Sequence, residues 1–271
     1  LLYGKCDRIG YKKSYIEYYF NGKFKRDYLK LENNLKCIKK ISNLLDEKDL
    51  DFDFIAHRIV HGGDFKKPRK INKQTRKEIK KYSVFAPMHN LMELDLIKSC
   101  KSLNKKQFAC FDTCFFTELP EVAKTFPLPS KILKKHNLKK YGFHGLSYKS
   151  VLSELNNLNK NTKSEKTIII HLGSGASICA IKNNKPLDIS MSLTPLEGLV
   201  MNTRCGSIDP GLVLFLKNKS YKVKKILNNE SGLSSFIKDF DMRSIVKNLN
   251  NKKTKLGFDL YIYRIINYIG A

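Results

Sequence analysis

The sequence predicts an α/β protein, because its apolar residues change from helical to extended spacing several times along the chain. In residues 34–50, apolar side chains recur every three or four positions, which predicts a helix. The run DFDFIAHRIV (51–60) that follows predicts a strand. Residues 166–192 predict three strands, joined first by a glycine turn and then by a turn at Asn183-Asn184.

The other elements follow from the same patterns. Residues 73–103 predict two helices around a proline-containing bend, and KQFACFDTCFF (106–116) predicts a strand that ends in polar residues. Residues 119–165 predict helices joined by loops. Two further helices are predicted, at 206–218, with Pro210 near the first turn, and at 254–271.

The chain of 271 residues is long enough for one large domain or two. The proline-rich turn near 116–130 is the predicted boundary, which gives one domain at 1–116 and a second at 117–271. No helix or strand is predicted before residue 34. The N-terminal sequence lacks the layout of a signal peptide, and no apolar run is long enough to span a membrane. The expected location is therefore cytoplasmic, without a membrane partner.

The formal net charge is +26, from 51 basic and 25 acidic residues. This excess favours a nucleic-acid partner only if the basic residues gather in one place. Here the lysines are scattered along the whole chain, so we expect a solvated surface and no nucleic-acid partner. The seven cysteines form no CxxC pair, which indicates buried reduced thiols rather than a zinc site.

The segment IAHRIVHGGDF places Arg58 inside an apolar run that ends at Gly62-Gly63. In an extended strand, Arg58 and Val60 share a face, because alternate side chains point the same way. A guanidinium beside a small apolar side chain suits a small ligand with one anionic end and one apolar end.

Two glycine-containing segments suggest anion binding. The loop HLGSGAS brings Gly173 and Gly175 directly after a buried strand, and glycines let backbone amides approach a phosphate closely. The irregular run 192–211 is rich in apolar residues, which predicts that it is packed rather than solvated. Its single arginine, Arg204, is therefore a candidate anion ligand.

Histidine and aspartate complete the candidate site. His144 lies between two glycines, which suits a ligand contact, and His89 closely follows a proline. Asp112 ends a predicted strand, where open α/β folds place metal-linked carboxylates; the alternative is a helix cap. The candidate site thus combines two arginines, two histidines, an aspartate and a glycine loop, and it has no serine or cysteine nucleophile in the setting of a catalytic triad. This combination favours phosphoryl transfer.

The motifs HRIVHGG, APMHN, FDTCF, YGFHGLSY, HLGSGAS and LTPLEGLVMNTRCGSIDP resemble, in order and spacing, those of the acetate kinase family. The resemblance implies a two-lobed fold of the actin and sugar-kinase (ribonuclease H-like) type, incomplete at both ends. It implies reversible, direct in-line transfer from ATP to acetate, giving acetyl phosphate and ADP. It also implies Mg²⁺ as cofactor and a homodimer.

The resemblance assigns roles to individual residues. It implies that Arg58, Asp112, His144 and Arg204 are catalytic, with Asp112 linked to magnesium only indirectly and no confident metal ligand in the chain. The implied acyl-substrate residues are Arg58, Val60, Met88, His89, Phe143 and Pro195. The implied nucleotide-binding residues are His171, Gly173, Ser174, Gly175, Asp241 and Arg243.

Two alternatives stay open. Propionate is the other acceptor, since one methylene changes binding in an apolar pocket by only about 1–3 kcal/mol. Ser174, Asn202, Cys205 and Ser207 depart from the family pattern. Ser174 and Asn202, together with the family segments expected to be missing at both ends, favour the second alternative, a truncated or degenerate relative that binds a nucleotide without turnover.

Overall fold

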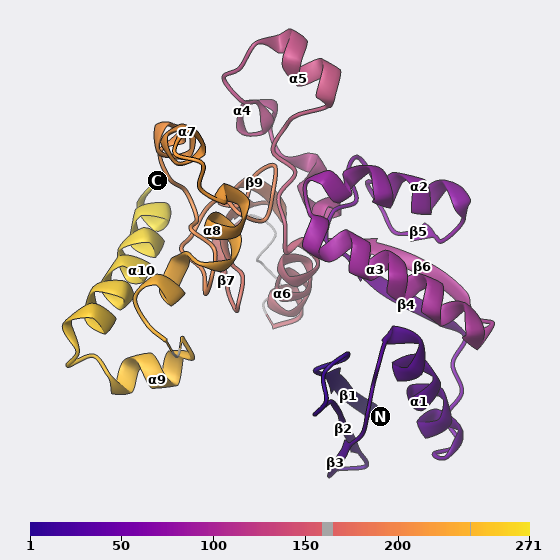
Figure 1. Cartoon of the computed structure of the whole chain (residues 1–271). Helices are drawn as coiled ribbons and strands as arrows, with labels where there is room; N and C mark the ends of the chain where they lie inside the picture. Colours follow the sequence, from indigo (N-terminus) through magenta and orange to yellow (C-terminus); the bar gives the residue numbers. More distant parts are fainter. Residues whose placement is uncertain (159–164, 239) are drawn as a thin grey trace. The chain divides into compact units, whose positions relative to one another are not determined.

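The computed structural model describes residues 1–158, 165–238 and 240–271, and it confirms the α/β class (Figure 1). The chain forms two compact units, which are described separately. Unit 1 comprises Leu1–Ile59, Arg69–Ser83 and Pro87–Cys110, and unit 2 comprises Val60–Pro68, Val84–Ala86 and Phe111–Ala271. The division into domains 1–116 and 117–271 stays a prediction.

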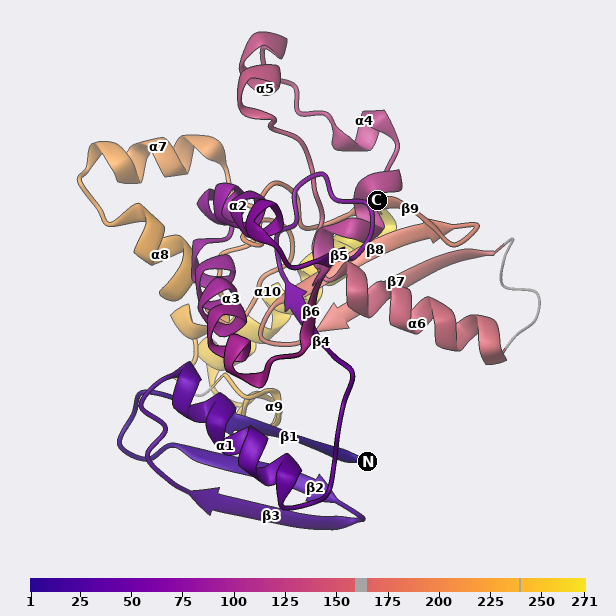
Figure 2. The ribbon, with the colours of Figure 1, turned by 90° about the vertical axis from the view of Figure 1, so that its right-hand side faces the viewer.

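Unit 1 begins with an antiparallel sheet that the sequence analysis did not predict. It consists of β1 (Leu2–Asp7), β2 (Tyr15–Phe20) and β3 (Lys23–Tyr28). The β2–β3 hairpin turns at Asn21-Gly22, both with positive φ, which is the backbone that a two-residue hairpin turn requires. Helix α1 (Asn34–Asp46) lies across one face of this sheet, where Leu44 packs against the buried Ile16 and Tyr18 (Figure 2).

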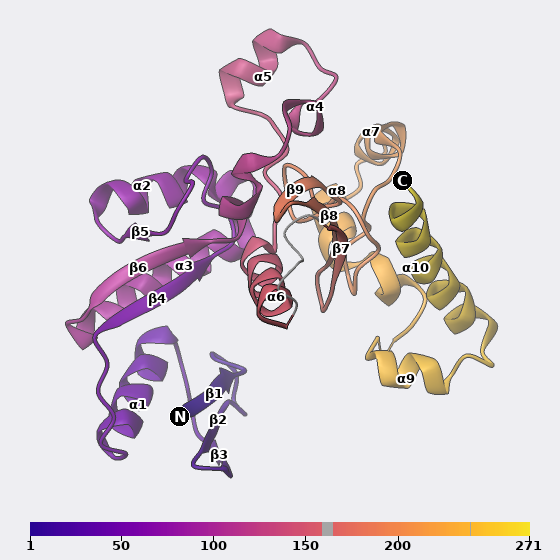
Figure 3. The same cartoon turned by 180° about the vertical axis from the view of Figure 1, so that it is seen from behind.

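The second sheet of unit 1 has the strand order β4-β6-β5. The helices of unit 1 lie where the sequence predicts them. Helix α1 corresponds to residues 34–50, and α2 and α3 flank the predicted proline-containing bend. Helix α3 lies along β4 and β6 (Figure 3). The elements are β4 (Phe54–Ile59), β5 (Arg69–Lys70), α2 (Lys73–Lys81), η1 (Tyr82–Val84), α3 (Pro87–Ser99), η2 (Cys100–Leu103) and β6 (Lys106–Phe111).

The strand predicted at 106–116 is five residues too long. Strand β6 ends at Phe111, and the chain continues as the 3-10 helix η3 (Asp112–Glu118). The Thr117 hydroxyl donates to the carbonyl of Cys114 (2.9 Å), which fixes a turn. Phe116 is only 1% exposed and belongs to the core of unit 2, so burial of this ring favours the turn over a continued strand.

Unit 2 contains the three antiparallel strands predicted at 166–192. They are β7 (Lys166–Leu172), β8 (Ala176–Lys182) and β9 (Lys185–Ile189), in that order. Asn183 and Asn184 both have positive φ, which confirms the Asn-Asn turn between β8 and β9.

The helices of unit 2 also follow the predicted segments (Figure 1). Asp209 caps α7 by accepting from the amide of Gly211, and Pro210 occupies its first turn, so this helix begins four residues later than predicted. Residues 159–164 of the predicted segment 119–165 lie outside the described residues. The helices are α4 (Glu121–Lys124), α5 (Ser130–His136), α6 (Gly145–Leu158), α7 (Pro210–Asn218), α8 (Val223–Asn229), η5 (Gly232–Ser235), α9 (Met242–Lys247) and α10 (Lys252–Gly270).

The irregular run 192–211 is packed, as predicted. Leu199, Val200 and Met201 are almost completely buried and join the core that β8 and α10 share. Packing of this run fixes the backbone around Arg204. Within the described ranges, no helix is both long enough and apolar enough to cross a lipid bilayer.

Candidate active site

The glycine loop is a tight turn between β7 and β8. His171 pairs with Ser177 across the two strands, and Leu172 pairs with Ala176, so Gly173, Ser174 and Gly175 alone make the turn. The amide of Gly173 donates to the carbonyl of Gly175 (3.0 Å) and closes it. The predicted nucleotide-binding role of this loop stays a prediction, but the Gly173 amide already has an acceptor inside the turn.

Gly175 allows the Arg204 guanidinium to approach the loop. A Cβ atom placed on Gly175 would lie 2.7 Å from Arg204 Nη2, closer than a real Cβ atom tolerates. Arg204 Nη1 donates to the carbonyl of Pro195 (2.5 Å), which holds the guanidinium in this position. The predicted acyl-pocket residue Pro195 therefore contacts Arg204 through its backbone.

The charge of Arg204 is not neutralised locally. The side chain is half-buried, and no carboxylate in the described ranges pairs with it. Burial lowers the pKa of Arg204, although a guanidinium stays protonated at any ordinary pH. A partly buried cation that pairs with no carboxylate among the described residues carries a desolvation cost that a bound anion offsets, so the position is suited to an anionic ligand.

His144 faces the same point of the loop. Its Nε2 atom lies 3.4 Å from the position of a Cβ on Gly175, while its Nδ1 atom lies 2.8 Å from the hydroxyl oxygen of Ser177. The imidazole stacks on that of His171, with ring centroids 4.1 Å apart. The structure thus brings together four residues that the sequence predicted: His144, His171, Gly175 and Arg204.

The backbone of His144 adopts an uncommon conformation, with φ at 61°. The next residue, Gly145, explains how this is held. A Cβ on Gly145 would lie 2.1 Å from the carbonyl oxygen of Asp112, so only glycine lets α6 begin this close to η3. The glycine after His144 therefore provides close packing rather than flexibility.

Three residues that support the histidines were not predicted. The hydroxyl groups of Tyr148 and Ser177 share a hydrogen bond (2.5 Å), and the hydroxyl oxygen of Ser147 lies 3.0 Å from His171 Nδ1. Burial raises the pKa of Tyr148, so its hydroxyl stays protonated. Tyr148, Ser177 and His144 form a hydrogen-bonded chain that fixes the orientation of the imidazole. Tyr148 follows His144 by four residues at the start of a helix, which was a usable sequence signal.

Asp112 directly follows β6 and is the first residue of η3. The side chain is 1% exposed. In the described part of the chain, no group of three or more histidine, cysteine, aspartate or glutamate residues could hold a metal ion. The metal-linked role of Asp112 therefore stays a prediction of an indirect contact.

Strand β4 ends at Ile59, and Val60 lies in a bend just beyond it, where it joins the core of unit 2 with Phe143. The expectation that Arg58 and Val60 share a face stays a prediction. Val60 and Phe143 are 4% and 1% exposed, so they are core residues of this unit.

Arg58, Met88 and His89 belong to unit 1. Arg58 is exposed near the end of β4, and Met88 and His89 lie in the first turn of α3. Their roles toward the substrate stay predictions. In unit 2, Asp241 caps α9 and accepts two hydrogen bonds from the guanidinium of Arg243, each 3.0 Å long. Arg243 lowers the pKa of Asp241 to about 2, and the nucleotide role of this pair also stays a prediction.

His61 is a buried histidine of unit 2 for which the sequence analysis found no role. It is completely buried, packs against the rings of Tyr141 and Phe143, and accepts a hydrogen bond from the amide of Gly63 at Nδ1 (3.1 Å). Burial lowers the pKa of His61 to about 4.

This shift predicts a loss of stability in mild acid. Between about pH 6.5 and 4, unfolded His61 binds a proton that the folded protein excludes, so the free energy of unfolding rises with pH across this window. The contribution is complete above pH 6.5 and amounts to about 3 kcal/mol. We expect urea unfolding of a His61→Asn variant to show a weaker dependence on pH between 6.5 and 4. Replacing the exposed His136 by asparagine should leave the profile unchanged; an unaltered profile in His61→Asn would contradict the assignment.

The chain resembles known proteins along its whole length. The model of the acetokinase family matches residues 1–271. The chain belongs to the acetokinase family. The acetate kinase of Borrelia turicatae is 37% identical, and the match covers 100% of this chain and 72% of the relative. The probable acetate kinase of Emericella nidulans is 39% identical, with 81% of this chain and 56% of the relative covered.

Solved structures show the same fold. A propionate kinase from Francisella tularensis has a TM-score of 0.94 at 30% identity, with 100% of this chain and 73% of that structure covered. The acetate kinase of Entamoeba histolytica has a TM-score of 0.86 at 33% identity, with 100% of this chain and 72% of that structure covered. The acetokinase-family chain thus spans about 56–73% of the length of these relatives.

Proposed function

We propose that the protein is an acetate kinase that transfers the terminal phosphoryl group of ATP to acetate, giving acetyl phosphate and ADP. The proposal is supported by one observation above all: Arg204 Nη2 and His144 Nε2 converge on the same point beside Gly175, 2.7 and 3.4 Å from it. Family membership supports the same reaction.

The residues suit in-line transfer. A phosphoryl group in transit spreads negative charge over its equatorial oxygens, so catalysis depends mainly on positioning and on charge stabilisation. Arg204 supplies a guanidinium that lacks a carboxylate partner among the described residues, and Ser177 orients the imidazole of His144 through Nδ1. Arg58 is proposed to hold the carboxylate of the acceptor, and Asp241 and Arg243 to lie near the adenosine.

Magnesium is proposed to enter with ATP. Protein-bound Mg²⁺ commonly keeps several waters and uses one or two carboxylates together with substrate phosphates. Asp112 is 1% exposed, and the described residues contain no group of three or more histidine, cysteine, aspartate or glutamate side chains that could hold a metal ion. Asp112 is therefore proposed to act only indirectly on the ion that enters with ATP.

Propionate is the second candidate acceptor, because the propionate kinase of Francisella tularensis has a TM-score of 0.94 with this chain. Val60, Phe143 and Pro195, with Met88, are the proposed wall of the acyl pocket. We also propose two lobes divided near residue 116, a homodimer and a cytoplasmic location.

The reaction is tested by incubating the protein with ATP, Mg²⁺ and acetate, and trapping acetyl phosphate with hydroxylamine. We expect acetyl hydroxamate to accumulate with a matching amount of ADP. Measuring kcat/KM for acetate and for propionate identifies the preferred acceptor. ATP binding without turnover of either acid would instead support a degenerate relative that only binds nucleotide.

Ser177→Ala is expected to lower kcat/KM about tenfold, because the imidazole of His144 loses the hydrogen bond that orients it. The variant also leaves the buried Tyr148 hydroxyl without this hydrogen-bond partner, which should cost about 1–3 kcal/mol of stability. The Tyr148→Phe/Ser177→Ala double variant removes both groups and should regain stability but not activity. Full activity of Ser177→Ala would show that His144 needs no such support.

A further inference from the structure

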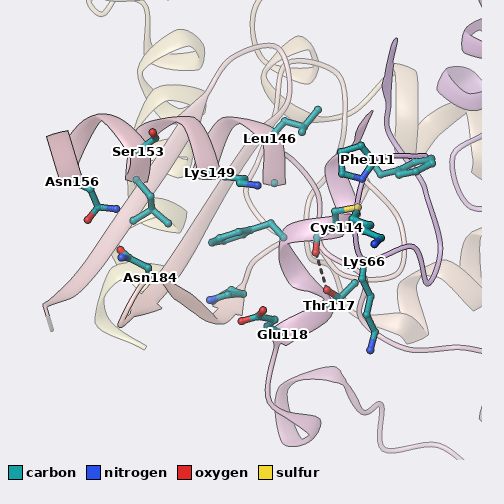
Figure 4. A pocket seen from close by; sticks show the side chains of 16 residues that line it. Lys66, Phe111, Cys114, Thr117, Glu118, Leu146, Lys149, Ser153, Asn156 and Asn184 are labelled. Carbon is teal, nitrogen blue, oxygen red and sulfur yellow. Dashed lines mark hydrogen bonds between the residues drawn. The ribbon is translucent and has the colours of Figure 1, made fainter. Parts of the chain in front are cut away.

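Unit 2 contains a cavity of about 450 Å³ that does not include the glycine loop, Arg204 or His144 (Figure 4). It lies between the loop that follows β4, helix η3, helix α6 from Gly145 to Asn156, and the turn that leads into β9. Its lining combines three lysines with an apolar floor. The lysines indicate a ligand with negative charges, and the apolar floor indicates a ligand with a carbon skeleton.

The positive charge comes from Lys66, Lys67 and Lys149. Among the described residues, none of these three ammonium groups lies within ion-pair distance of a carboxylate. The one acidic residue in the described lining, Glu118, pairs with Lys185 (3.5 Å) outside it. A chain of charge +26 has many unpaired lysines, so what matters here is that three of them border one cavity.

The floor is apolar. Phe111 and Leu152 are 1% and 7% exposed and line the cavity together with Phe115. Figure 4 shows Lys149, Ser153 and Asn156 following one another along α6, and Lys66 on the opposite side of the cavity. A ligand with a carbon skeleton could therefore rest on the rings while its charged groups reach the lysines.

We propose that this cavity is a binding site for a small organic polyanion, whose flat or apolar skeleton packs on Phe111, Phe115 and Leu152. Its carboxylate, phosphate or sulfonate groups pair with Lys66, Lys67 and Lys149. Lysine binds such groups as a mobile point charge, so the site selects for several negative charges more than for one oxyanion geometry. A ligand with a single charge leaves two of the lysines without an anion.

The cavity is also placed to influence the candidate active site. Gly145 lines the cavity and directly follows His144, and Phe111 lines it and directly precedes Asp112. A ligand that moves α6 against η3 displaces both catalytic candidates, because the carbonyl of Asp112 lies against Gly145. This coupling, unlike the binding itself, rests on the proposed function.

The binding is tested with 8-hydroxypyrene-1,3,6-trisulfonate, a flat polyanion whose fluorescence anisotropy reports its binding to the protein. We expect the Lys67→Glu/Lys149→Glu variant to weaken binding at least tenfold. The control is Lys134→Glu/Lys135→Glu, which makes the same charge change on the exposed face of α5 and should weaken binding less than twofold. Ser153→Tyr, which narrows the cavity without changing its charge, should also weaken binding of the probe. If the charge variant fails to fold, binding to Ser153→Tyr tests whether the probe occupies this cavity.

A second measurement locates the probe. Cys114 lines the cavity and Cys205 does not, so the probe should slow alkylation of Cys114 at least threefold and leave that of Cys205 unchanged. Equal weakening in the two lysine variants, or loss of binding only in Arg204→Ala, would overturn the proposal. For the coupling, the probe should change kcat at least twofold in the unaltered protein and not in Lys67→Glu/Lys149→Glu. An unchanged kcat would refute the coupling alone, whereas absence of any turnover would count against the proposed function.

Discussion

Replacing Arg204 by alanine is expected to lower kcat/KM for acetyl phosphate formation by about 10²–10³-fold, which corresponds to about 3–4 kcal/mol of transition-state stabilisation. The guanidinium is the cationic group that the structure brings against the glycine loop, 2.7 Å from the point above Gly175. Trapping the product with hydroxylamine measures the loss.

The same variant should fold as stably as the unaltered protein. No carboxylate in the described ranges pairs with Arg204, and its contact with the Pro195 carbonyl is offset by the cost of burying the charge. A low activity at an unchanged midpoint of urea unfolding is therefore the signature of a catalytic rather than a structural arginine. Arg76→Ala, on α2 of unit 1, is the matched control and should change neither quantity.

Arg204→Lys separates charge from geometry. A lysine keeps one positive charge but lacks the planar fork that contacts both Pro195 and the loop. We expect its activity to fall between those of arginine and alanine. If Arg204→Ala retained full activity, or lost stability in parallel with activity, the assignment of Arg204 to the transferring phosphoryl group would be wrong.

Local sequence signals predicted much of the fold, and the errors have physical causes. The glycine turn, the Asn-Asn turn and the helix with Pro210 in its first turn each depend on a few neighbouring residues, and the structure contains all three. The N-terminal sheet was missed even though Asn21-Gly22 is a strong hairpin signal. Its strands carry many exposed lysines and tyrosines, so the apolar alternation there is weak.

The candidate site was predicted only in part, because some contacts depend on tertiary packing. His144 and Arg204 stand in segments that resemble the family, but the register of β7 against β8 is what brings Ser177 beside His144, 33 residues away. The expectation for Val60 assumed a strand that continues to this residue, but β4 ends at Ile59 and Val60 belongs to the core of unit 2. A periodicity argument holds only as far as the element continues.

Gly145→Ala adds one methyl group at the start of α6. We expect this substitution to lower the stability of the protein more than a methyl group added at any other position of α6. The new Cβ would lie 2.1 Å from the carbonyl oxygen of Asp112 and 2.8 Å from the Cβ of Phe115, and neither atom belongs to the end of a flexible side chain. Relief requires that α6 move away from η3, and α6 carries Tyr148, which joins the hydrogen-bonded chain to His144. We expect a loss of about 3 kcal/mol in the free energy of unfolding, together with lower activity.

Gly270→Ala supplies the control, because a Cβ on this glycine near the end of α10 meets no atom within 4 Å. Alanine is the better helix former there, so the control should be neutral or stabilising by less than about 1 kcal/mol. Urea unfolding of both variants, followed by circular dichroism, gives the comparison. Equal stabilities would mean that α6 and η3 are not packed as closely as the contact between Gly145 and Asp112 requires, and that the position of His144 does not depend on that contact.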